Sequence, residues 1–213
     1  MKSFVACPGR RAFLIALGCA TALGSSRLLA DATARVGDPA PAFRVSDADG
    51  RTRELSQFAG KVMVLEWTSP SCPFARAQYE SGVMQQLQRM ATGQGMVWLT
   101  VLSAHPSRRD YLPPAKAAVF HRARGGASTA LLLDSDGAMG RAYGARVTPH
   151  VFIIAADGRL AYAGGAGDKA TMNPQEVRAS RSYIRAALED LAAGRKVSTP
   201  SSRPFGCAIA YAG

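Results

Sequence analysis

The chain contains 213 residues, of which 47% are hydrophobic and 19% are charged, and its formal net charge is +11. This length suffices for one sizeable hydrophobic core, and the composition excludes an intrinsically disordered protein. The positive charges are scattered singly and are not interleaved with aromatic residues, which argues against nucleic-acid binding. No apolar run reaches the ~18 residues that a stable membrane span needs.

The first 34 residues have the pattern of an export signal. Arg10 and Arg11 precede a short apolar stretch, residues 12–23, and small residues follow it. This order is typical of a signal peptide, and Arg-Arg-x-Phe-Leu resembles the twin-arginine signal even though Gly9 replaces the usual Ser or Thr. We therefore expect residues 1–34 to be cleaved after Ala34 and the mature protein to be periplasmic. The twin-arginine route is favoured, and the general secretory route stays open.

Strands and helices are expected to alternate in a domain of residues 35–193. The strands are expected over 43–46 and 52–55, joined by an Asp-Gly turn, and over 62–67, 96–102, 129–133, 151–154 and 160–163. Apolar spacing predicts helices over 74–90, 114–124, 139–143 and 176–193. This order indicates an α/β fold with a mixed central sheet, helices on both faces and an N-terminal β-hairpin. Residues 194–213 form a tail rich in Ser, Pro and Gly.

Of the four cysteines, Cys7 and Cys19 leave with the predicted signal. The mature chain then keeps one possible pair, Cys72 and Cys207, in a compartment that permits disulfides. A crosslink between them would close a loop of more than a hundred residues, which the chain-entropy model values at about 4–5 kcal/mol. A structural staple, a redox couple and two unpaired thiols are all compatible with the sequence.

Cys72 lies between the predicted buried strand 62–67 and the helix that begins near residue 74. The first turn of a helix presents unpaired N–H groups and a partial positive charge, and a cysteine placed there has a pKa below the usual ~8.5. Pro73 suits this first turn because its missing N–H is no loss there. The position predicts a nucleophilic thiolate rather than an inert buried thiol.

Several segments together resemble the thioredoxin superfamily. They are residues 37–43, 60–65 and 67–74, and Val147-Thr148-Pro149 before a strand. The resemblance covers about residues 36–193 and is to the redoxin branch, which includes alkyl hydroperoxide reductases, thiol-specific antioxidant proteins and thioredoxin-like reductases. It implies a thioredoxin-like fold with a cis bond between Thr148 and Pro149. It also implies that Trp67, Pro73, Thr148 and Pro149 line the substrate site, with the Thr148 backbone pairing with a peptide or thiol substrate.

Two positions depart from the patterns of this superfamily. Ala75 stands where thioredoxin-type reductases have a second cysteine, and Ser69 stands where peroxiredoxins have a threonine. Dithiol exchange within one short motif is therefore impossible. We predict a thiol-dependent oxidoreductase in which Cys72 attacks a peroxide or a disulfide and Cys207 resolves the product. The sequence does not decide between the two substrates.

The expected partners are a thiol or peroxide substrate and a protein or small-thiol reductant. We expect no cofactor, no resident metal, no nucleic acid and no stable membrane span. Two other functions stay open: a non-catalytic scaffold stapled by a Cys72–Cys207 disulfide, and a metal chaperone that uses both cysteines with His150. Glu66, near the end of the strand before Cys72, is expected to be either a buried proton relay or a solvated carboxylate.

Overall fold

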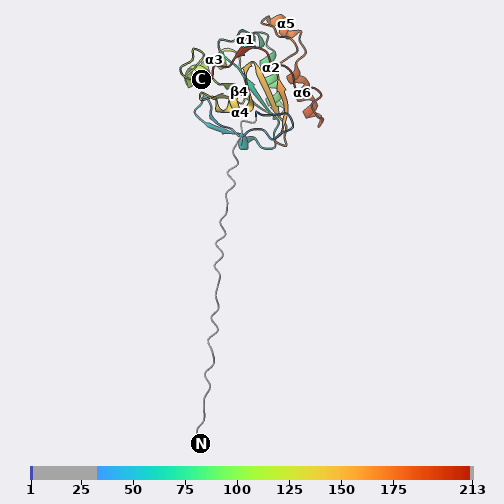
Figure 1. The fold of residues 1–213 in the computed structure, drawn as a ribbon. Helices are drawn as coiled ribbons and strands as arrows, with labels where there is room; N and C mark the ends of the chain where they lie inside the picture. Colours follow the sequence, from blue (N-terminus) through green and yellow to red (C-terminus); the bar gives the residue numbers. More distant parts are fainter. Residues whose placement is uncertain (2–32, 212–213) are drawn as a thin grey trace. The chain divides into compact units, whose positions relative to one another are not determined.

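The computed structural model describes Met1 and residues 33–211 (Figure 1). The predicted export signal, with Cys7 and Cys19, lies almost entirely outside these residues. Within the described part of the chain, none of the helices combines the length and the apolar character that crossing a bilayer requires.

An N-terminal hairpin precedes the main sheet. Strand β1 (Arg44–Ser46) pairs antiparallel with β2 (Thr52–Glu54) around the predicted Asp-Gly turn. Gly50 in that turn has a φ of +79°, a conformation that glycine adopts without steric cost. A 3-10 turn, η1 (Leu55–Phe58), leads from the hairpin toward the sheet.

The centre of the fold is a five-stranded mixed sheet with the order β5-β4-β3-β7-β8. Its members are β3 (Met63–Trp67), β4 (Val97–Leu102), β5 (Ala130–Leu133), β7 (His150–Ile154) and β8 (Leu160–Gly164). Strands β3, β4 and β5 are parallel, β7 is antiparallel to β3, and β8 is antiparallel to β7. Every residue of β3, β4 and β7 is buried, as expected for strands that are covered on both faces.

Helices cover both faces of this sheet, which confirms the predicted fold class. They are α1 (Pro73–Glu80), α2 (Val83–Gly93), α3 (Pro114–Ala123), α4 (Ala138–Tyr143), α5 (Pro174–Arg178) and α6 (Tyr183–Ala192). Side chains of α1, α2 and α6 share one apolar cluster with Val64 of β3, and Figure 1 shows α2 and α6 next to each other. Side chains of α4 share a second cluster with Leu65 and Trp67, whose side chains point to the opposite face of the sheet from Val64.

Two predicted helices are each divided in the structure. The helix expected over 74–90 is α1 followed by α2, with Gly82 at a left-handed φ of +78° between them. The helix expected over 176–193 is α5 followed by α6, and the Ser182 hydroxyl accepts the Arg185 N–H to cap the second helix. Apolar spacing alone does not reveal either break, because both halves of each pair bury apolar side chains.

The tail contains a strand that the sequence did not predict. Strand β9 (Cys207–Ala208) pairs antiparallel with β6 (Val147–Thr148), and Cys207 lies directly opposite Thr148. The bond between Thr148 and Pro149 is cis, as predicted. The pairing places Cys207 at the same end of the sheet as Cys72.

Candidate active site

Cys72 is the N-cap residue of α1, which confirms its predicted place at the start of a helix. Its sulfur accepts the N–H of Ala75 at 3.5 Å, and Pro73 occupies the first turn. The Cys72 thiol donates a hydrogen bond to the carbonyl oxygen of Thr148 at 2.8 Å. The residue is only 1% exposed, so the sulfur lies under the loop before Pro149 and not on an open surface.

Cys207 reaches the same sulfur from β9, and both cysteines are free thiols. Cys207 stands opposite Thr148, whose carbonyl oxygen accepts the Cys72 thiol, so the two cysteines lie close enough for each to shift the pKa of the other. Burial raises the pKa of Cys72, but the neighbouring Cys207 and the Ala75 N–H, which donates to the sulfur, lower it by more, so this pKa lies below that of an ordinary thiol. Burial, with the hydrogen bond to Cys72 and its charge, raises the pKa of Cys207 to about 12. Cys72 therefore ionises first.

Glycine at position 206 makes this close approach possible. Gly206 has a φ of +142°, and a Cβ atom built there would lie 1.9 Å from the carbonyl oxygen of Thr148. Any side chain would push the tail away from β6. Beside it, the rings of Phe205 and Phe74 pack edge to face with centroids 6.1 Å apart. These two contacts hold the tail against the first turn of α1.

Glu66 is fully buried behind the site, so of the two expectations for this carboxylate the solvated one is wrong. Its oxygens accept hydrogen bonds from four buried side chains: Tyr79, Gln88, Trp98 and Thr100. Burial raises the pKa of Glu66, whereas the charge of Arg124 and these donors oppose the rise. Burial is the larger effect, so the pKa of Glu66 lies above its ordinary value.

Arg124, at the end of α3, was not singled out by the sequence. Its guanidinium carbon lies 3.4 Å from the centroid of the Tyr79 ring and 4.5 Å from that of Phe120. The guanidinium donates to the Thr68 hydroxyl and to the Ala75 carbonyl, both at 3.4 Å. The charges of Glu66, Tyr79 and Cys72 all act on it. An arginine near the end of a helix has no distinctive local pattern, so only the fold reveals this cation beside the site.

Trp67 and Ser69 occupy different environments at the end of β3. Trp67 is completely buried, donates to the Ser103 hydroxyl at 2.9 Å and packs against Tyr143 and Phe152. Its assignment to the substrate site stays a prediction. The Ser69 hydroxyl donates to the Asp110 carboxylate at 2.7 Å. The hydroxyl three residues before the cysteine is thus already engaged.

His150 does not join the two cysteines. Burial, together with the charge of Arg146, lowers the pKa of His150 to about 4, and its Nδ1 accepts the Arg146 N–H at 3.3 Å. Its ring packs on Phe152. Within the described residues, no group of three or more His, Cys, Asp or Glu side chains is arranged to hold a metal ion. The metal-chaperone alternative therefore has no support in this part of the chain.

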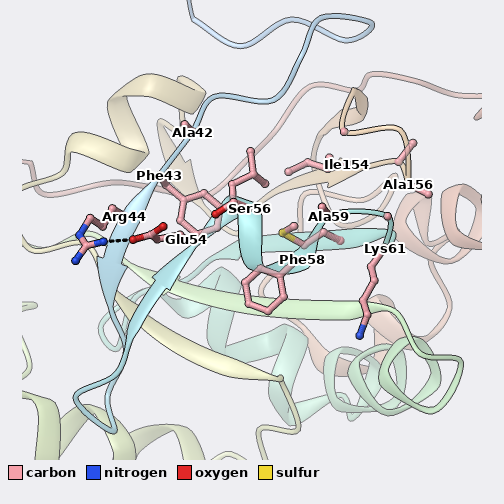
Figure 2. Close-up of a pocket in the computed structure, with 15 residues that line it drawn as sticks. Ala42, Phe43, Arg44, Glu54, Ser56, Phe58, Ala59, Lys61, Ile154 and Ala156 are labelled. Atoms are coloured by element: carbon pink, nitrogen blue, oxygen red, sulfur yellow. Dashed lines mark hydrogen bonds and ion pairs between the residues drawn. The ribbon is translucent and has the colours of Figure 1, made fainter.

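Among the cavities of the described residues, two lie on different sides of the Cys72 strand. One, of about 600 Å³, is lined by Phe43, Phe58 and Met63 among others, with the Arg44–Glu54 ion pair at its side (Figure 2). Met63 begins β3 and Cys72 follows its other end, so this cavity is remote from the thiols. A second, of about 390 Å³, adjoins the Cys72 loop. It is lined by Ser69, Pro70, Arg76, Tyr79, Glu80, Phe120, Ala123 and Arg124.

Solved structures with the same fold come from several bacteria. A hypothetical protein from Sinorhizobium meliloti 1021 is similar with a TM-score of 0.72 and 22% identity, covering 85% of this chain and 97% of that one. An uncharacterized conserved protein from Geobacillus kaustophilus has a TM-score of 0.73 and 23% identity, covering 84% and 93%. A putative protein disulfide isomerase from Bacteroides thetaiotaomicron has a TM-score of 0.55 and 19% identity, covering 75% and 91%. At these identities the similarity shows the fold.

Family assignment comes from the sequence itself. No curated protein matches this chain significantly. The Redoxin family model matches residues 35–180, which contain Cys72, Thr148 and Pro149 and end before Cys207. The match covers most of the chain and supports thiol-dependent oxidoreductase chemistry at the level of the family. The chain therefore belongs to the Redoxin family, within the thioredoxin superfamily.

Proposed function

We propose that this chain is an exported thiol–disulfide oxidoreductase in which Cys72 is the nucleophile and Cys207 is the resolving cysteine. The observation that carries the proposal is the pairing of the two sulfurs. A thiol with a lowered pKa caps α1 and donates to the Thr148 carbonyl, and a second thiol, with a raised pKa, stands opposite Thr148 on β9. Membership of the Redoxin family supports the chemistry.

The reaction runs through a mixed disulfide. The Cys72 thiolate attacks one sulfur of a substrate disulfide, and the other substrate sulfur leaves as a thiolate and takes up a proton. Cys207, after losing its own proton, attacks the Cys72 sulfur and releases the second substrate thiol. The substrate gains two electrons and becomes a dithiol, while the protein loses two electrons and keeps a Cys72–Cys207 disulfide. A protein or small-thiol reductant of the same compartment must restore the two thiols.

The pKa of Cys207 also changes during this cycle. The hydrogen bond to Cys72 and the negative charge of Cys72 contribute to the raised pKa of Cys207. Both contributions vanish once Cys72 is bonded to substrate, because its sulfur is then neutral. The pKa of Cys207 falls at that point, and the Phe74 N–H, which donates to Cys207, stabilises the new thiolate. The resolving thiol thus becomes active when it is needed.

The geometry favours a disulfide over a peroxide as the substrate. The Ser69 hydroxyl, at the position where peroxiredoxins have a threonine, is engaged with Asp110. The Thr148 backbone already pairs with an extended segment that presents a cysteine to Cys72, which is the arrangement that a disulfide-bearing substrate requires. Pro73 and Pro149 flank this position, and Trp67 supports it from the core.

Oxidised glutathione tests the proposal on the reduced mature chain. Wild type should form an intramolecular disulfide between Cys72 and Cys207 and release two glutathione thiols per chain. Cys207→Ser should accumulate one glutathione on Cys72, and Cys72→Ser should accumulate none at the site. Mass spectrometry of non-reduced peptides separates these products. If Cys207→Ser carries no glutathione on Cys72 while the fold is intact, the proposal is wrong.

Two further measurements separate the alternatives. A catalytic disulfide should have a reduction potential above about −300 mV, whereas a permanent staple should lie below it and resist glutathione. Hydrogen peroxide in place of the disulfide should oxidise the reduced protein more slowly. Faster oxidation by peroxide would instead assign the same two cysteines to a thiol peroxidase cycle, in which a Cys72 sulfenic acid is resolved with release of water.

A further inference from the structure

Strand β9 holds an unusual place for part of a tail. It forms backbone pairs with β6, and it places Cys207 opposite Thr148, whose carbonyl oxygen accepts the Cys72 thiol. An extended segment that pairs with a sheet edge and presents a cysteine to the nucleophile has the form of a bound peptide. Here that segment belongs to the same chain, and it leaves Cys72 almost completely buried.

We propose that β9 is a built-in competitor strand, which occupies the edge of β6 that an extended, cysteine-containing polypeptide would pair with. The inference rests on the proposed function and names its substrate class: a disulfide within a polypeptide, which reaches Cys72 by exchanging with β9. A polypeptide that displaces β9 forms the mixed disulfide with Cys72. Return of β9 then brings Cys207 back to resolve it.

The contacts that hold β9 on the edge of β6 are few, which allows the strand to leave this edge. Strand β9 has two residues, one half-buried and one exposed, and so short a strand is marginal by itself. Its only strand partner among the described residues is β6, outside the five-stranded sheet. The tail before it bridges Ala163 of β8 at Ser201, and Ile209 after it packs against the apolar cluster that contains Trp67. Release of β9 therefore breaks its pairing with β6 and the Ile209 contact but no strand pair of the main sheet.

Gly206 allows the strand to be released without altering a cysteine. In Gly206→Ala the new Cβ would meet the Thr148 carbonyl oxygen at 1.9 Å, so β9 must move away from β6. Gly194→Ala is the matched control. It imposes a similar strain at a positive φ of +69°, but nothing lies within 4 Å of its Cβ. Phe205→Ala is a second variant, which weakens the same strand through its side chain with no backbone clash.

The probe is a fluorescent peptide with the sequence of residues 202–211, in which serine replaces the cysteine. Its binding to each reduced protein is measured by fluorescence anisotropy. A site that is open only part of the time shows an affinity reduced by the open fraction. Gly206→Ala should therefore bind the peptide at least about tenfold more tightly than wild type. Phe205→Ala should change in the same direction, and Gly194→Ala should match wild type. The plateau rate of Cys72 alkylation by iodoacetamide at high pH, where the thiol is ionised in every variant, should rise in the two variants that bind more tightly.

Two results would overturn the inference. Unchanged alkylation in both Gly206→Ala and Phe205→Ala would show that β9 does not cover Cys72. Faster alkylation without tighter peptide binding would show that the released edge does not take a polypeptide. Because the peptide has no thiol, its binding is independent of redox chemistry. Failure of wild type to form the Cys72–Cys207 disulfide with glutathione would therefore count against the proposed function and not against the competitor strand.

Discussion

Replacing Cys207 by alanine should raise the pKa of Cys72 by about one pH unit. The substitution removes the S–H donor that stabilises the Cys72 thiolate. A hydrogen bond to a charged group contributes about 1.5–3 kcal/mol, and one pH unit corresponds to about 1.36 kcal/mol. Cys207 is partly exposed, so water replaces some of the lost stabilisation, and the lower end of the resulting range of roughly 1–2 pH units applies.

The assay measures the rate of Cys72 alkylation by iodoacetamide as a function of pH. The pH at the midpoint of this curve gives the pKa of Cys72, and the plateau rate is not used. The midpoint is independent of how often the tail opens, provided that opening does not itself depend on pH. Cys207→Ser keeps a hydroxyl donor and should lie between wild type and Cys207→Ala. A midpoint that does not move in Cys207→Ala would refute the assignment of Cys207 as the main stabilising partner of the thiolate.

Three other substitutions probe the surroundings of the site. Glu66→Gln turns an amide N–H toward buried donors and should lower the free energy of unfolding by about 1–3 kcal/mol in urea titrations; no loss would mean that the carboxylate network contributes nothing. Burial lowers the pKa of both His121 and His150 from 6.5 to about 4, so the folded state binds fewer protons than the unfolded state between these values. Each histidine should therefore lower the stability by as much as about 3 kcal/mol as the pH falls from 6.5 to 4, and His150→Gln should remove only its own share of that fall. Trp67→Phe removes the donor to the Ser103 hydroxyl and should cost about 1–2 kcal/mol in the same titrations, while an unchanged midpoint would contradict this.

Features that depend on residues close together in the chain could be predicted from the sequence. The apolar run that became β3, the Cys72-Pro73 junction and the Thr148-Pro149 pair each depend on local backbone preferences and local burial. They identified the order of strands and helices and a thiol at a helix start, while the cis bond was implied by the resemblance to the thioredoxin superfamily. The breaks at Gly82 and before Ser182 were missed, because apolar spacing continues across them.

The amino-acid sequence by itself determined that one thiol lies at the start of a helix. Only the tertiary structure decided that the tail returns to β6, that Cys207 meets Cys72 there, and that Arg124 lies beside them. A two-residue strand has no periodicity to recognise, and its pairing depends on a partner about sixty residues away in the chain. The backbone approach at Gly206 that permits this pairing exists only once both segments are folded.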